Sequence, residues 1–120
     1  MARDMQLTER TLLDLLAAPE NTGLAAIFSP RSYPRRRIVF TPHDDDNLVF
    51  VVAKGRIRIF LAEDGKELTV SILKPGDIYS THTRAYVQSY KDSTILVASL
   101  AEFQRQVSSY PELTYGIIGV

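Results

Sequence analysis

The fold of this chain is decided by Leu48-Val-Phe-Val-Val-Ala53, the dipeptide Lys54-Gly55 and Arg56-Ile-Arg-Ile-Phe-Leu61. The first run is rich in β-branched residues and is typical of a buried strand. The second alternates charged and apolar residues, as a half-buried strand requires. Beyond it, Glu63-Asp-Gly65 is a hairpin signal, and residues 67–73 provide the returning strand. The sequence therefore predicts three consecutive β-strands, the last two paired as a hairpin.

The rest of the chain predicts further strands framed by short helices. The pattern becomes strand-like from Tyr33 onward, and further strands are expected over residues 35–40, 85–90 and 93–98. Helical patterns cover residues 8–18, 23–28, 100–109 and 112–120, with Ser29-Pro30 ending the second helix and Ser99 and Glu102 capping the third. Short strands separated by Gly and Asp turns indicate a mainly β fold, an antiparallel double-stranded β-roll of the jelly-roll type with short flanking helices.

A second informative stretch runs from Lys74 to Val87 and contains His82, one of two histidines. Pro75-Gly76-Asp77 is a turn signature, because proline presets one backbone angle, glycine accepts positive φ and the Asp side chain bonds its own backbone. His82 follows in a short polar connection that enters a strand. Ordered connections of this kind often present functional side chains.

Composition limits the function. At 120 residues and 13.5 kDa the chain is one domain with a core of its own. The formal net charge is zero, which gives no electrostatic case for nucleic-acid or membrane-surface binding by this piece. There is no cysteine, which excludes disulfides, thiolate metal sites and cysteine nucleophiles. With no signal peptide and no long apolar run, we expect a soluble cytoplasmic protein.

Several segments together resemble the sensor domain of the cyclic-AMP receptor and FNR regulator superfamily. They are residues 50–60, residues 66–79, Phe103 and Tyr110-Pro-Glu-Leu113. The resemblance covers nearly the whole chain. It implies a cyclic-nucleotide-binding-domain-like roll and the start of a C-terminal dimerisation helix. Residues 1–120 would then be an N-terminal sensor domain that stops near the start of that helix, with a helix-turn-helix DNA-binding domain beyond it and a homodimer in the intact protein.

Within this superfamily, the segment Gly76-Asp-Ile-Tyr-Ser-Thr-His-Thr-Arg-Ala85 resembles the carbon-monoxide-sensing haem regulators called CooA. Cyclic-nucleotide domains carry a longer phosphate-binding cassette at this place, and only five residues separate Ile78 from Arg84 here. The CooA resemblance implies haem b as cofactor and His82 as an axial ligand of its iron. It also implies the amine of Ala2, after removal of Met1, as the weak ligand that the effector CO displaces.

The resemblance implies roles for further residues. Asn47 aligns with the partner of the free ring nitrogen of the axial histidine, which normally needs an acceptor. Tyr79, Ser80 and Ile117 are expected at the haem-binding site; Gly116 and Gly119 would allow close approach of a flat macrocycle or a helix partner. Ser80 stands where several CooA proteins carry a cysteine that ligates oxidised iron. Because residues beyond Val120 would normally wall the pocket, we expect partial or absent haem in a chain that ends there.

Other interpretations of the same residues stay open. His82 could be a polar loop histidine, and the roll could sense another small effector. A degenerate cupin enzyme is a third alternative, but the first cupin motif is missing, so we expect no enzyme activity. We expect His43 to lie in a solvated acidic loop, and Arg35-Arg36-Arg37 to form a charged strand edge that discourages aggregation. DNA would be bound only through the missing C-terminal domain, and no membrane partner is expected.

Overall fold

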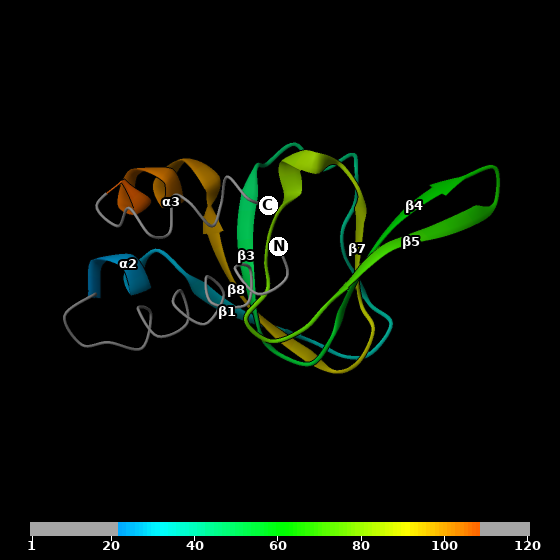
Figure 1. Ribbon diagram of the computed structural model, residues 1–120, viewed down its shortest axis with the longest axis horizontal. Helices are drawn as coiled ribbons and strands as arrows, with labels where there is room; N and C mark the ends of the chain where they lie inside the picture. Colours follow the sequence, from blue (N-terminus) through cyan, green and yellow to red (C-terminus); the bar gives the residue numbers. More distant parts are fainter. Residues whose placement is uncertain (1–21, 109–120) are drawn as a thin grey trace, which may run out of the picture.

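The computed structural model describes residues 22–108, which form two four-stranded antiparallel sheets and short helices (Figure 1). One sheet has the order β1-β8-β3-β6 and the other the order β2-β7-β4-β5. The strands are β1 (Ser29–Tyr33), β2 (Ile38–Phe40), β3 (Leu48–Lys54), β4 (Ile57–Glu63), β5 (Lys66–Leu73), β6 (Ile78–Ser80), β7 (Tyr86–Ser89) and β8 (Ser93–Ser99). The helices are α2 (Thr22–Ala26), the 3-10 helix η2 (Thr81–Thr83) and α3 (Leu100–Val107). The predicted mainly β double-sheet roll is confirmed.

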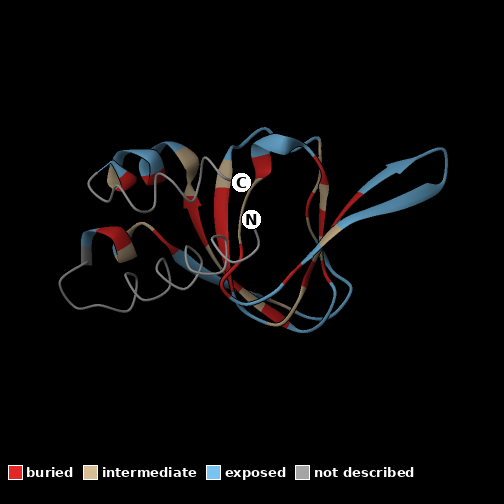
Figure 2. Ribbon diagram, in the orientation of Figure 1, coloured by how far each residue is buried: buried red, intermediate tan, exposed pale blue. Residues whose placement is uncertain are grey.

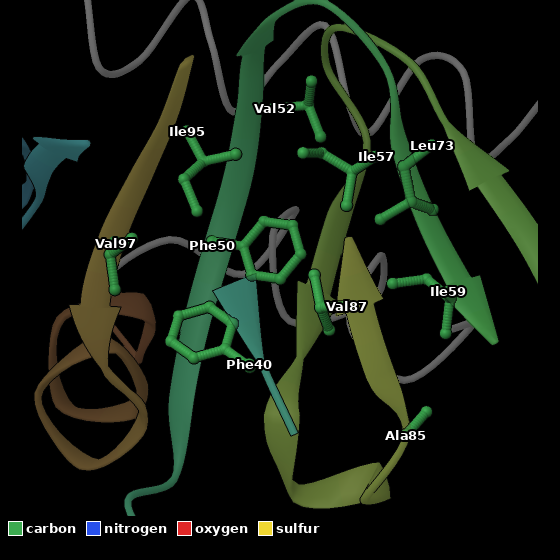
Figure 3. Close-up of a cluster of buried hydrophobic side chains, with 10 residues drawn as sticks. All are labelled: Phe40, Phe50, Val52, Ile57, Ile59, Leu73, Ala85, Val87, Ile95 and Val97. Atoms are coloured by element: carbon green, nitrogen blue, oxygen red, sulfur yellow. The ribbon is translucent and has the colours of Figure 1, made fainter. Parts of the chain in front are cut away.

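Strand β3 is buried on both of its faces. Phe50 and Val52 point into the roll, where they pack with residues of both sheets, and Phe40 stacks against Phe50 with ring centroids 6.1 Å apart (Figure 3). Val49 and Val51 point the other way, into a second cluster that includes residues of both helices. A strand covered on both faces needs a continuous apolar run, which explains the predicted strand over residues 48–53.

The second cluster holds α2 and α3 against the outer face of the first sheet. Helix α3 begins after Ser99, whose side chain accepts a hydrogen bond from the backbone N–H of Glu102 at 3.4 Å, as the capping pattern predicts. Phe103 and Val107, four residues apart, are its buried residues. The ring of Phe103 meets that of Phe28, which follows α2, edge to face at 5.8 Å. This packing places Phe103 beside β3.

The hairpin β4–β5 projects from the roll and is exposed along most of its length (Figure 2). Its two-residue turn has positive φ at both Asp64 (53°) and Gly65 (76°), the geometry that the Glu63-Asp-Gly65 signal predicts. At the base of the hairpin, Arg58 lies 4.2 Å above the Phe60 ring and forms an ion pair with Glu67 at 2.9 Å.

Three expectations need correction. Strand β1 begins at Ser29, before Tyr33, and Pro30 fits because β1 is an edge strand that needs no second partner. Residues 35–37 form a turn with Arg36 at φ 65°, so they are no strand edge and the strand begins at Ile38. The polar connection after Asp77 contains a strand, β6, which pairs with β3 through Val49 and Ser80. Each of these depends on pairing between distant residues, which local patterns do not report.

The helices predicted over residues 8–18 and 112–120 lie outside the described residues. Between residues 22 and 108, no helix is long and apolar enough to cross a membrane.

Candidate functional site

The site begins with the turn at Pro75-Gly76-Asp77, which is built as predicted. Gly76 has φ 98°, and the carboxylate of Asp77 accepts a hydrogen bond from the backbone N–H of Lys74 at 2.8 Å. Backbone bonds tie the turn to β3, because Gly76 donates to Val52 at 2.8 Å and Val52 donates to Asp77 at 3.0 Å. The segment that follows therefore starts from a fixed point on the central strand.

Helix η2 is anchored by the buried side chain of Thr81. Its hydroxyl accepts a hydrogen bond from the backbone N–H of Leu48 at 2.9 Å and donates to the carbonyl of Asp46 at 3.2 Å. Arg84 ends the helix in the left-handed conformation (φ 59°). With Thr81 turned inward, His82 is left exposed, in the connection that the sequence predicts for it.

The imidazole of His82 is bonded by its near neighbour Ser80. The Ser80 hydroxyl lies 2.5 Å from Nδ1 of His82. Asn47, which the CooA resemblance places at that nitrogen, instead accepts a hydrogen bond from the Arg84 guanidinium at 3.1 Å. Arg84 also donates to the backbone carbonyl of Asp44. The structure thus brings Ser80 to the ring nitrogen and brings Asn47 to Arg84.

His82 lines a cavity of about 310 Å³ between η2, strand β6 and helix α3. The other residues that line it are Val49, Ile78, Tyr79, Ser80, Thr83 and Phe103. Tyr79 also packs against Phe50 with ring centroids 5.7 Å apart and shares a hydrogen bond between hydroxyls with Thr83. An apolar wall with one exposed imidazole suits a flat, largely apolar group held through one metal–nitrogen bond.

Three of the expected site residues, Tyr79, Ser80 and His82, therefore meet at one cavity, whereas Asn47 does not line it and bonds Arg84. Ala2 and Ile117 fall outside the described residues. Sequence reasoning did not place Phe103 at the site. Its signal was its spacing from Val107, four residues along the same buried face of α3.

His43 is exposed in the loop before β3, and its backbone N–H donates to the Thr41 hydroxyl at 3.2 Å. In the part of the chain that the structure describes, no three His, Asp or Glu side chains lie close enough together to hold a metal ion. The facial metal site of a cupin enzyme therefore has no counterpart among these residues.

Comparison with known proteins places this geometry in context. The family model for the cyclic nucleotide-binding domain matches residues 30–110. A crystal structure of the heme domain of CooA from Carboxydothermus hydrogenoformans is similar, with 40% identity, a TM-score of 0.80 and coverage of 88% of this chain and 78% of that one. The imidazole-bound form of CooA from that organism, a CO-dependent transcription factor, has 39% identity and a TM-score of 0.80, over 89% of this chain and 49% of that one.

A curated relative is the cyclic AMP receptor protein of Thermus thermophilus, which is 34% identical over 64 residues. That match covers 52% of this chain and 30% of the relative, so it spans less than a third of that protein's length. Because the family model matches more than half of the chain, the chain belongs to the cyclic nucleotide-binding domain family, in the group of the cyclic-AMP receptor and FNR regulators.

Proposed function

We propose that this chain is the haem-binding sensor domain of a CO-responsive transcriptional activator, with His82 as the protein ligand of the haem iron. The observation that carries the proposal is the exposed imidazole of His82 at a cavity walled by Val49, Ile78 and Phe103. The similarity to the heme domain of CooA supports the same cofactor. The DNA-binding domain beyond Val120 and a homodimer of the whole regulator are part of this proposal.

The contact between Ser80 and His82 prepares the ring for a metal. A neutral imidazole has one protonated nitrogen and one lone pair. In the tautomer in which Nδ1 donates to the Ser80 hydroxyl, 2.5 Å away, Nε2 keeps the lone pair that a metal needs. Such an outer hydrogen bond also fixes the ring orientation and raises its basicity as a ligand. In that tautomer, Ser80 orients the proposed ligand and accepts the hydrogen bond of its Nδ1 proton.

The remaining residues of the site are apolar. Phe103, Val49 and Ile78 would offer apolar surface to a porphyrin. Haem iron would supply the site at which CO replaces the weakly held amine of Ala2. Ala2 and Ile117 stay proposals from the family resemblance, because both lie outside the described residues.

Cyclic nucleotide binding is the second candidate, because the matched family is named for it. Arg84 is the cation that would meet a phosphate. Its guanidinium is engaged by Asn47 and by the carbonyl of Asp44, and the three-residue helix η2 occupies the segment before it. A phosphate would have to displace both partners of Arg84, which makes this function the weaker candidate.

The test is an absorption titration of the full-length protein, which extends beyond Val120 in this proposal, with excess ferrous haem, with and without CO, for the wild type and for His82→Ala. We expect a Soret band that sharpens and shifts with CO in the wild type. His82→Ala should lose the ligand-bound spectrum, because no other nitrogen ligand lines the cavity among the described residues. His43→Ala is the matched control, since it removes the other histidine from an exposed loop, and it should behave as the wild type.

Two outcomes would overturn the haem proposal. One is a spectrum that His82→Ala leaves unchanged, and the other is no haem uptake at any excess. A calorimetric titration with cyclic AMP completes the experiment. Saturable binding that His82→Ala retains and Arg84→Gln abolishes would establish the second candidate in place of the first.

A further inference from the structure

The end of the roll farthest from His82 gathers positive charge from three separate turns. We call it the basic end, and it consists of Arg35, Arg36, Arg37, Lys54, Arg56 and Lys91. The first three residues lie between β1 and β2, the next two at the turn from β3 to β4, and the last between β7 and β8. All six are exposed except Arg56, which is half-buried. The three turns gather at the lower end of the roll in Figure 1 and are largely exposed in Figure 2.

Buried hydroxyls and backbone bonds lock these turns together. The Ser89 hydroxyl donates to the carbonyl of Pro34 at 2.5 Å and accepts from the backbone N–H of Arg37 at 3.0 Å. The Ser93 hydroxyl accepts from the backbone N–H of Arg56 at 3.0 Å, and the N–H of Tyr90 donates to the carbonyl of Arg56 at 2.9 Å. The cations are therefore held on one rigid platform and are not scattered on independent loops.

The charge of the basic end is hardly neutralised within the described residues. Of the twelve lysines and arginines between residues 22 and 108, six lie here, against one of the nine aspartates and glutamates, Asp92. One oxygen of Asp92 is occupied by the backbone N–H of Arg35 at 2.8 Å. The ion pairs of Arg58 with Glu67 and of Lys74 with Asp77 lie elsewhere. The neutral formal charge of the whole chain thus hides a local positive field.

We propose that the basic end binds the phosphate backbone of a nucleic acid without reading its sequence. Four of its six cations are arginines, whose planar guanidinium pairs well with phosphate. A protein partner would be expected to need an apolar centre. Of the exposed large apolar side chains among the described residues, Leu61, Leu68, Val70 and Ile72 lie on the β4–β5 hairpin. Ile38 and Tyr90 adjoin the basic end, and two such residues are too few to form an apolar centre. This inference rests on the charge arrangement and does not depend on the haem proposal.

The test measures fluorescence anisotropy of a short labelled DNA duplex of arbitrary sequence against the chain over a series of salt concentrations. The variant Lys54→Gln/Lys91→Gln removes two cations of the basic end. The control Lys66→Gln/Arg105→Gln removes two cations elsewhere and gives the same net charge. None of these four side chains makes a hydrogen bond or ion pair with another described residue, so both variants should melt as the wild type does.

We expect weak binding that falls with salt. The slope of log K against log salt should drop by about 0.9 for each phosphate that the protein no longer neutralises, hence by about 1.8 in the first variant and by nothing in the control. Equal reductions of the salt slope in the two variants would overturn the proposal, since the effect would then depend on net charge alone. An absence of DNA binding at low salt would overturn it too. Displacement of the duplex by poly-glutamate at equal charge concentration would also overturn it, in favour of an acidic protein partner.

Discussion

The two ends of the roll use the same construction for opposite purposes. Strand β3 connects them, and the six steps of about 3.3 Å between its seven residues separate them by about 20 Å. At the His82 end, the hydroxyl of Thr81 ties a helical turn to an acidic loop and leaves an imidazole beside a cavity. At the basic end, Ser89 and Ser93 tie three turns into a cationic platform. The core is common to both, and the turns decide what each end can bind.

The ends also differ in how firmly they are fixed. At the basic end, the turn that contains Gly55 lies so close to Asp92 and Ser93 that there is no room for a side chain at position 55. At the His82 end, the functional side chains are exposed or half-buried and are bonded to near neighbours in the sequence, Ser80 with His82 and Tyr79 with Thr83. We therefore expect substitutions of Gly55 and Ser93 at the basic end to change stability, and substitutions of the exposed or half-buried His82 and Ser80 to change the site while sparing the fold.

The largest effect is expected for Gly55→Ala. A Cβ at Gly55 would lie 2.2 Å from the Ser93 hydroxyl and 2.4 Å from the carbonyl of Asp92, at a φ of 92° that other residues rarely adopt. Strain and overpacking together should lower the free energy of unfolding by about 3 kcal/mol or more, measured by urea denaturation. DNA binding by the basic end should fall as well, because the turns that carry Lys54 and Lys91 must move apart.

Gly65→Ala is the matched control for that prediction. Gly65 also has positive φ, at 76°, but nothing lies within 4 Å of the position of its Cβ. Only the backbone strain of a positive φ remains, so the free energy of unfolding should fall by about 1 kcal/mol. Equal costs for the two alanines would show that the close packing at Gly55 does not determine the stability of the basic end.

An intermediate effect is expected for Ser93→Ala. Its buried hydroxyl accepts from the backbone N–H of Arg56 and contacts the carbonyl of Lys91 at 2.7 Å. Removing it leaves buried backbone groups without a partner, at a cost of about 2 kcal/mol in the free energy of unfolding. Ser32→Ala removes an exposed hydroxyl bonded to Thr94 and should cost about 0.5 kcal/mol. If the two substitutions lower the free energy of unfolding by the same amount in urea denaturation, the hydroxyl of Ser93 does not hold the turns of the basic end together.

Much of the fold was predictable because its signals are local. The apolar run over residues 48–53, the Asp64-Gly65 turn and the Ser99 cap each specify structure within a few residues, and all three are confirmed. Strand β6 was not predicted, because its three residues are too few to show the alternation of apolar and polar residues that marks a strand. It forms because its residues find partners on β3 from Val49 to Val51.

The two ends were predictable to different degrees for the same reason. The expectation that His82 lies in a connection entering a strand followed from a local turn and a polar run, and the structure places it in η2, between β6 and β7. The basic end was not anticipated, because Arg35, Lys54 and Lys91 are distant in the sequence and the total charge is zero. Arg35-Arg36-Arg37 was interpreted as a strand edge, whereas the hydrogen bonds of Ser89 hold it as a turn beside the other cations. Charge segregation of this kind is a property of topology, and composition does not report it.

The smallest effect on stability is expected for Ser80→Ala. This variant is also the most direct test of the site around His82. Because the hydrogen bond to His82 lies at the surface, its loss should change the free energy of unfolding by about 0.5 kcal/mol or less. The ring should nevertheless lose its fixed tautomer. Nitrogen NMR shifts of the imidazole in the haem-free chain should change from those of one tautomer to those of a mixture.

Asn47→Ala separates the two possible partners of the ring nitrogen. Asn47 accepts from Arg84, so its removal should leave the nitrogen shifts of His82 as they are in the wild type. The opposite pattern, with Asn47→Ala altering the shifts and Ser80→Ala leaving them unchanged, would return the orienting role to Asn47, as the family resemblance implies. In the expected pattern, Ser80 orients the proposed haem ligand through a single hydrogen bond. The His82 end would then be adjustable by one hydroxyl that the fold does not need, whereas the hydroxyls of the basic end are needed to keep it folded.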